Sequence, residues 1–131
     1  MGRKSSLLVA VVVLGLLTGC TTSATSRSVS QERKDALKEF GDLLKALQEE
    51  GTKPPAKLAA LEPIEPRIPV AGPAIRNGDI VYIWGAEYAP GSNKLVAYEK
   101  QTPTDGGLVL LQDGTVKEMS SAEFSSAPKA K

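Results

Sequence analysis

Prolines divide this chain into two parts whose apolar residues follow different patterns. Four of its nine prolines fall within residues 62–73, where a regular helix or a central strand would lose backbone donors. Before this segment apolar residues recur at helical spacing, and after it they gather in short runs bounded by turn residues. We therefore expect an α+β fold: one amphipathic helix, then a proline-rich connector, then a small antiparallel four-strand β-meander.

The helix is expected over residues 30–51. Its apolar positions fall on one face at helical period: Ala36, Leu37, Phe40, Leu43, Leu44 and Leu47. Gly51 is placed to end the helix, and Gly41 weakens it by about 1 kcal/mol relative to alanine. The apolar face has three possible partners: the protein's own sheet, a second helix in a coiled coil, or a membrane surface. Only two heptads fit and the polar face mixes acids with bases, so the sheet is favoured.

The connector is expected over residues 52–74. Pro63, Pro66 and Pro69 are three residues apart, which is the period of a polyproline II helix. In that conformation residues 62–73 would span about 37 Å, at about 3.1 Å per residue. Two interpretations remain open: a semi-rigid spacer laid over the domain, or a docking strip for an aromatic groove on a partner.

A small β domain is expected over residues 75–124. The predicted strands cover residues 80–84, 94–100, 108–112 and 115–119. Asp113 and Gly114 predict a two-residue hairpin turn between the last two strands. Residues 125–131 read as a disordered tail.

The first residues of the chain have the pattern of a secretion signal. Arg3 and Lys4 precede an uninterrupted apolar run over residues 7–17. This run is too short to cross a bilayer, which takes about 20 residues, but it has the length of the apolar region of a signal peptide.

The residues after this run indicate the type of signal. Leu17, Thr18, Gly19 and Cys20 resemble the lipobox of bacterial lipoproteins, in which a branched aliphatic residue and two small residues precede a cysteine. The resemblance implies cleavage between Gly19 and Cys20 and lipid attachment to Cys20. Residues 1–19 are then a cleaved signal peptide, and residues 20–29, which are small and polar, a lipidated flexible tether. Acyl chains contribute about 0.8 kcal/mol per buried CH₂, so such anchoring, by palmitate and related chains, is stable.

The residue after the cysteine bears on the destination of the protein. Thr21 occupies the position where an aspartate resembles an inner-membrane retention signal. We therefore expect a lipid-anchored protein of the outer membrane that faces the periplasm.

Composition argues against several classes of function. Histidine is absent and Cys20 is the single cysteine, so the commonest general base and the usual zinc ligands are missing. From Cys20 onward the chain carries 14 basic and 15 acidic residues, which is not the footprint of a nucleic-acid-binding protein. No carboxylate pair or phosphate-binding motif is recognisable. The sequence predicts no catalytic residue, no metal, no cofactor and no enzyme activity.

The best candidate site is a set of aromatic residues. The predicted first strand is apolar on both faces, whereas a two-layer fold buries only one. Either both faces are covered, or an aromatic face remains for a partner, built from Tyr82, Trp84, Tyr88 and Tyr98.

The function expected from these features is that of a lipid-anchored envelope protein with a non-enzymatic structural or protein-interaction role. Its partner would be an unidentified envelope protein or a second copy of the chain. One alternative is a phage-type lysis or exclusion lipoprotein, because a lipobox followed by a proline-rich stretch resembles outer-membrane spanin subunits. Those subunits tend to be short and poorly folded, unlike the compact sheet predicted here. Another alternative is a small-ligand-binding module, which would need a larger pocket than this β segment encloses.

Overall fold

The protein is an antiparallel sheet enclosed between helices. The computed structural model describes residues 21–131, with side chains from Ser28 onward. In chain order the elements are α1 (Thr21–Glu49), the 3₁₀ helix η1 (Leu58–Arg67), α2 (Ala71–Arg76), β1 (Ile80–Tyr82), β2 (Leu95–Glu99), α3 (Thr102–Asp105), β3 (Gly107–Leu111), β4 (Val116–Met119) and α4 (Ser121–Ser126). The strands lie in the order β1-β2-β3-β4, each antiparallel to the next. The predicted α+β meander is confirmed.

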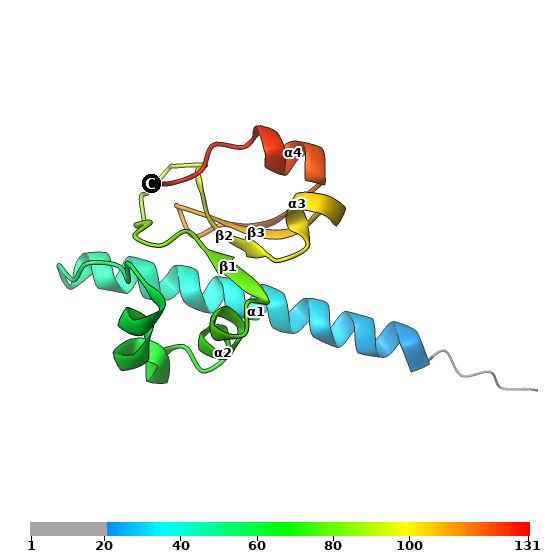
Figure 1. Cartoon of the computed structure of the whole chain (residues 1–131), viewed down its shortest axis with the longest axis horizontal. Helices are drawn as coiled ribbons and strands as arrows, with labels where there is room; N and C mark the ends of the chain where they lie inside the picture. Colours follow the sequence, from blue (N-terminus) through cyan, green and yellow to red (C-terminus); the bar gives the residue numbers. More distant parts are fainter. Residues whose placement is uncertain (1–20) are drawn as a thin grey trace, which may run out of the picture.

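Both faces of the sheet are covered. Figure 1 shows α1 and α2 on one side of the sheet, with α3 and α4 on the other. Side chains of α1, α2 and the sheet form the larger apolar core, and Phe124 of α4 packs into a smaller one with Leu95, Val109, Leu111 and Met119. The apolar character of both faces of β1 therefore has a structural explanation, because this small fold has three layers rather than two.

The predicted apolar stripe of α1 faces the protein's own sheet. Its six residues, from Ala36 to Leu47, are all at most 4% exposed. The ring of Phe40 meets that of Tyr82 edge to face, with ring centres 4.7 Å apart. After the helix, Gly51 adopts a φ of 71°. The amides of Gly51 and Thr52 donate to the carbonyls of Gln48 and Leu47, which is the Schellman arrangement expected after a helix end.

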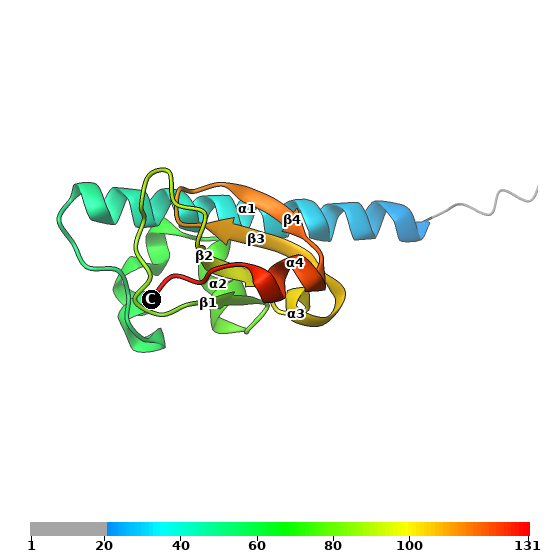
Figure 2. The same cartoon turned by 90° about the horizontal axis from the view of Figure 1, so that it is seen from above.

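The beginning of α1 differs from the prediction. The helix starts at Thr21 and not at residue 30, so the tether predicted over residues 20–29 is helical from Thr21 onward. Serine and threonine are only modest helix formers, but extending an existing helix avoids the cost of nucleation. The N-terminal end of α1 projects beyond the sheet, as Figure 2 shows.

The strands lie within two residues of the predicted bounds: β1, β2 and β4 are shorter than predicted, and β3 is shifted by one residue. The hairpin between β3 and β4 has a three-residue loop rather than the predicted two, because the Leu111 amide donates to the Thr115 carbonyl. Gly114 closes this loop with a φ of 89°, which suits glycine in a turn followed by a bulge. The register between β2 and β3 shifts between Leu95 and Ala97, which marks a bulge.

The connector is helical, so the polyproline interpretation of residues 62–73 is wrong. Its α2 helix packs against α1 and its η1 helix against α2, and Leu61 and Ile68 are fully buried. The apolar residues of this segment follow a helical spacing that the prolines obscure: Leu61, Ile64, Ile68, Ala71 and Ile75. Burial of this row outweighs the backbone donors that the prolines remove.

The last residues are ordered, contrary to the disordered tail predicted over residues 125–131. The Leu95 amide donates to the Pro128 carbonyl, and the Ala130 amide donates to the Leu95 carbonyl. Ala130 is buried, and the ammonium of Lys129 lies 4.6 Å from the centre of the Phe124 ring. The segment therefore pairs with the start of β2, where β1 has already ended.

Candidate functional site

The four aromatic residues proposed from the sequence do not form one face. Tyr82 is only 3% exposed, and its hydroxyl donates a 2.6 Å hydrogen bond to the Ala86 carbonyl. Burial raises the pKa of the Tyr82 hydroxyl above its usual value of 10.0. Tyr82 is therefore a core residue that is not available to a partner.

Tyr98 lies on the opposite side of the sheet. It pairs across strands with Val81, whose side chain points away from that of its neighbour Tyr82. The Tyr98 ring packs edge to face on Phe124, with ring centres 4.7 Å apart. Alternation along the strand therefore separates Tyr98 from Tyr82.

Trp84 and Tyr88 remain as candidates, and both belong to the segment after β1. Trp84 is 38% exposed and packs edge to face on Tyr82, with ring centres 5.1 Å apart. The Gly85 amide donates to the Pro55 carbonyl, which fixes this segment against the loop that follows α1.

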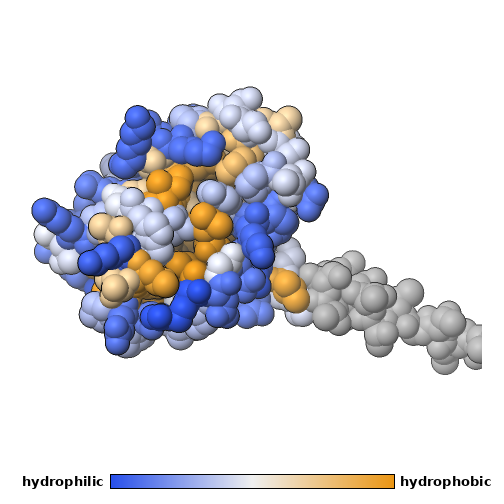
Figure 3. Space-filling view, viewed as in Figure 1, coloured by the Kyte–Doolittle hydropathy of each residue, from blue (hydrophilic) through white to orange (hydrophobic). Residues whose placement is uncertain are grey.

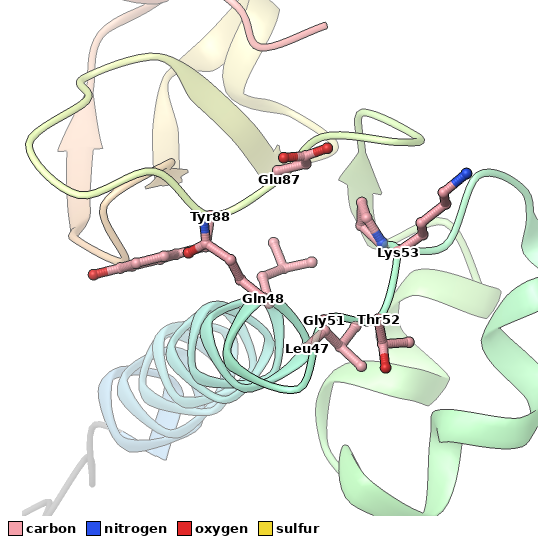
Figure 4. Close-up of a pocket in the computed structure, with 9 residues that line it drawn as sticks. Leu47, Gln48, Gly51, Thr52, Lys53, Glu87 and Tyr88 are labelled. Atoms are coloured by element: carbon pink, nitrogen blue, oxygen red, sulfur yellow. The ribbon is translucent and has the colours of Figure 1, made fainter.

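Tyr88 lines a small cavity between this segment and the end of α1. The cavity has a volume of about 210 Å³ and is lined by Leu44, Leu47, Gln48, Gly51, Thr52, Lys53, Pro54, Glu87 and Tyr88. Figure 4 shows Glu87 and Tyr88 on the loop side, opposite the end of α1 and the residues that follow it. We refer to this cavity as the Tyr88 notch.

The notch combines an apolar interior with charged residues at its rim. Leu44 and Leu47 are nearly fully buried, whereas Gln48, Lys53 and Glu87 are exposed. Such a surface accepts an apolar side chain and offers hydrogen-bonding groups around it, as the centre and rim of a protein interface do. The Lys53 ammonium and the Glu87 carboxylate allow it to contact groups of either charge.

The polar residues of the notch were not identified from the sequence. Gln48 and Lys53 lie more than 30 residues from Glu87 and Tyr88, and the fold brings them together. The available local signals were the end of the helix at Gly51 and the break at Pro54 and Pro55. Neither signal reveals which later segment packs against this corner.

A second polar cluster, around Glu99, has a structural role rather than the features of a binding site. Glu99 is only 7% exposed, and its carboxylate accepts hydrogen bonds from the Leu108 amide and the Gln101 side chain, both at 2.9 Å. A Cβ atom at Gly107 would lie 2.6 Å from this carboxylate. Glu99 therefore holds the β2–β3 connection together, and glycine is required beside it.

The predicted lipidation and cleavage residues, Cys20 and Gly19, lie outside the described residues. Within residues 21–131, no helix has both the length and the apolar character needed to cross a bilayer. Among the same residues, no three side chains of His, Cys, Asp or Glu gather as a metal site would require.

Comparison with known proteins gives no relative. No protein family, no curated protein and no solved structure matches this chain.

Proposed function

We propose that this chain is a lipid-anchored envelope protein with a non-enzymatic role in binding another envelope protein. The observation that carries the anchor is the order of three features in the sequence. A basic start, an apolar run over residues 7–17 and the residues Leu17-Thr-Gly-Cys20 follow one another as in a lipoprotein precursor. Thr21, in place of aspartate, favours the outer membrane and a periplasmic location for the folded part.

The binding role is supported by the Tyr88 notch. Pockets for small molecules usually measure about 300–1,000 Å³, whereas the notch measures about 210 Å³. A space of this size suits one or two side chains of a partner. Trp84, on the same segment of the chain, adds an exposed ring of the kind that is enriched at protein interfaces.

The anchor is tested by labelling cells that express the full chain with radioactive palmitate. We expect label in the wild-type protein, and none in a Cys20→Ser variant, which should accumulate as an unprocessed precursor. Equal labelling of the two proteins would refute the anchor.

The binding role is tested by mild crosslinking in cells followed by purification of the full chain. We expect a defined partner whose recovery falls strongly in a Tyr88→Ala or a Trp84→Ala variant. Leu58→Ala is a matched control, because Leu58 is 41% exposed but does not line the notch. Unaltered recovery with both aromatic variants would exclude this surface.

A further inference from the structure

The outward face of α1 carries a regular row of polar residues. It lies opposite the apolar stripe, and all its members are exposed: Gln31, Asp35, Lys38, Asp42, Lys45 and Glu49. Successive members are four, three, four, three and four residues apart, so the row stays straight along the helix. We refer to it as the charged row. Figure 2 shows α1 along one edge of the molecule, where a second molecule could approach it.

The sign of the charge alternates along the charged row from Asp35 to Glu49. The Gln31 amide donates a 2.8 Å hydrogen bond to Asp35. The ion pairs found among residues 28–131 join Arg33 to Asp79, Arg67 to Glu50 and Arg76 to Glu65. Lys38, Asp42 and Lys45 take part in none of these pairs. Their charges therefore remain available to a partner.

We propose that the charged row pairs with the same row of a second copy, with the two α1 helices antiparallel. In that arrangement Asp35 faces the partner's Lys45, and Lys38 faces the partner's Asp42. The two-fold symmetry repeats both contacts, which gives four oppositely charged pairs. Gln31 then faces the partner's Glu49, and an amide can donate to a carboxylate. A parallel pair in register would instead place each charge against its own copy.

Alternating charges also occur on helix faces that contact only solvent, because they stabilise the single helix. From Asp35 onward, neighbours three or four residues apart along the row have opposite charges and support the helix itself. This effect acts within one chain, however, and does not bring two copies together. A test must therefore measure association and orientation rather than stability.

The association is expected to be weak in dilute solution and sensitive to salt. Exposed ion pairs contribute little individually and are screened at high ionic strength. Attachment to a common surface would raise the effective concentration of the copies, as it does for other linked binding sites. The pairing itself does not require the anchor, so the test below removes it.

Orientation is tested by disulfide trapping in the full-length chain, purified in detergent in a Cys20→Ser background. Each chain then carries one thiol and no lipid. One preparation carries Gln31→Cys and the other Glu49→Cys, and the two are mixed and oxidised at low salt. We expect the mixed 31–49 disulfide to exceed both homodisulfides well beyond a statistical distribution. A statistical mixture, or an excess of homodisulfides, would overturn the antiparallel pairing.

Charge reversal tests the contacts in the same assay. Lys38→Asp or Asp42→Lys, placed in both preparations, creates two like-charged contacts and should slow formation of the mixed disulfide about tenfold. When one preparation carries Lys38→Asp and the other Asp42→Lys, every contact is again complementary and the rate should recover. Lys57→Asp and Glu32→Lys are controls with the same charge changes outside the row. Single reversals without effect, or a mixture that fails to recover, would refute the proposal.

Discussion

Gly41 of α1 lies directly against Leu110 of β3. A Cβ atom at residue 41 would sit 2.9 Å from the Leu110 Cδ1 atom and 3.5 Å from the Gly114 Cα atom. Leu110 is fully buried, so its methyl group has little room to move. Glycine in the middle of α1 therefore permits the close approach of the helix to the sheet.

Helix propensity and packing predict opposite effects of Gly41→Ala on the free energy of unfolding. Propensity predicts a gain of about 1 kcal/mol, and overpacking of a core costs about 1–3 kcal/mol. We expect packing to prevail, so Gly41→Ala should lower the free energy of unfolding by about 1 kcal/mol. Urea denaturation measures this change, with Ala46→Gly on the same helix as a reference for propensity. A Gly41→Ala protein more stable than the wild type would contradict the packing argument.

The carboxylate of Glu39 attaches the start of α2 to α1. It accepts hydrogen bonds from the amides of Val70 and Ala71, at 3.0 and 2.7 Å. Glu39→Gln removes the charge and should cost about 1 kcal/mol of the free energy of unfolding, as the loss of a helix cap does. Glu32→Gln, an exposed change on the same helix, should leave the denaturation midpoint unchanged. Equal midpoints for the two variants would show that the Glu39 contacts contribute nothing.

The Tyr82 hydroxyl makes stability depend on pH in the alkaline range. Burial raises the pKa of Tyr82 in the folded state above the usual 10.0, so its contribution is complete below pH 10 and is lost as the pH rises. At pH 8, Tyr82→Phe should be less stable than the wild type by about 1 kcal/mol, since the Ala86 carbonyl loses its donor. Above pH 10 this advantage of the wild type should fall by about 1.4 kcal/mol per pH unit, so that the sign of the difference reverses before pH 11. A constant difference between pH 8 and pH 11 would exclude this role for Tyr82.

The sequence predicts the elements that depend on local patterns. The spacing of Leu37, Phe40 and Leu44 identifies the helix and its buried face, and Gly51 marks its end. Asp113 and Gly114 identify the last hairpin. In each case the signal lies within a few residues of the structure that it predicts, so no knowledge of the rest of the chain is needed.

The connector and the last residues depend on contacts between distant parts of the chain. Leu61 and Ile68 are buried in the core that they share with residues of α1, α2 and the sheet, and Ala130 is held in place by its hydrogen bond to Leu95. The prolines of the connector predicted an extended segment, and the position of residues 125–131 at the end of the chain predicted disorder. Tertiary burial outweighed both.

The candidate site was only partly predictable, because it too depends on contacts between distant parts of the chain. The sequence shows that aromatic residues cluster around β1, but the direction of each side chain follows from register and from what covers the sheet. Tyr82 points into the core between the sheet and α1, and Tyr98 points toward Phe124 on the other side of the sheet. Trp84 and Tyr88 remain because they follow the strand, where alternation no longer applies.

The final segment should contribute measurably to stability. Truncation after Ala127 removes two backbone hydrogen bonds to Leu95, the buried Ala130 and the contact of Lys129 with Phe124. We expect this change to lower the free energy of unfolding by about 2 kcal/mol. Deletion of the exposed Lys131 alone is the control and should have little effect. A truncated protein as stable as the wild type would mean that the segment is not held in solution.

The proposed anchor at Cys20 is tested most directly by the intact mass of the protein extracted from bacterial membranes. We expect a chain that begins at Cys20 and carries the added mass of a diacylglycerol group and an amide-linked acyl chain. The Cys20→Ser variant should retain the mass of the unmodified precursor. A wild-type protein that begins at Met1 without added lipid would contradict the proposed function.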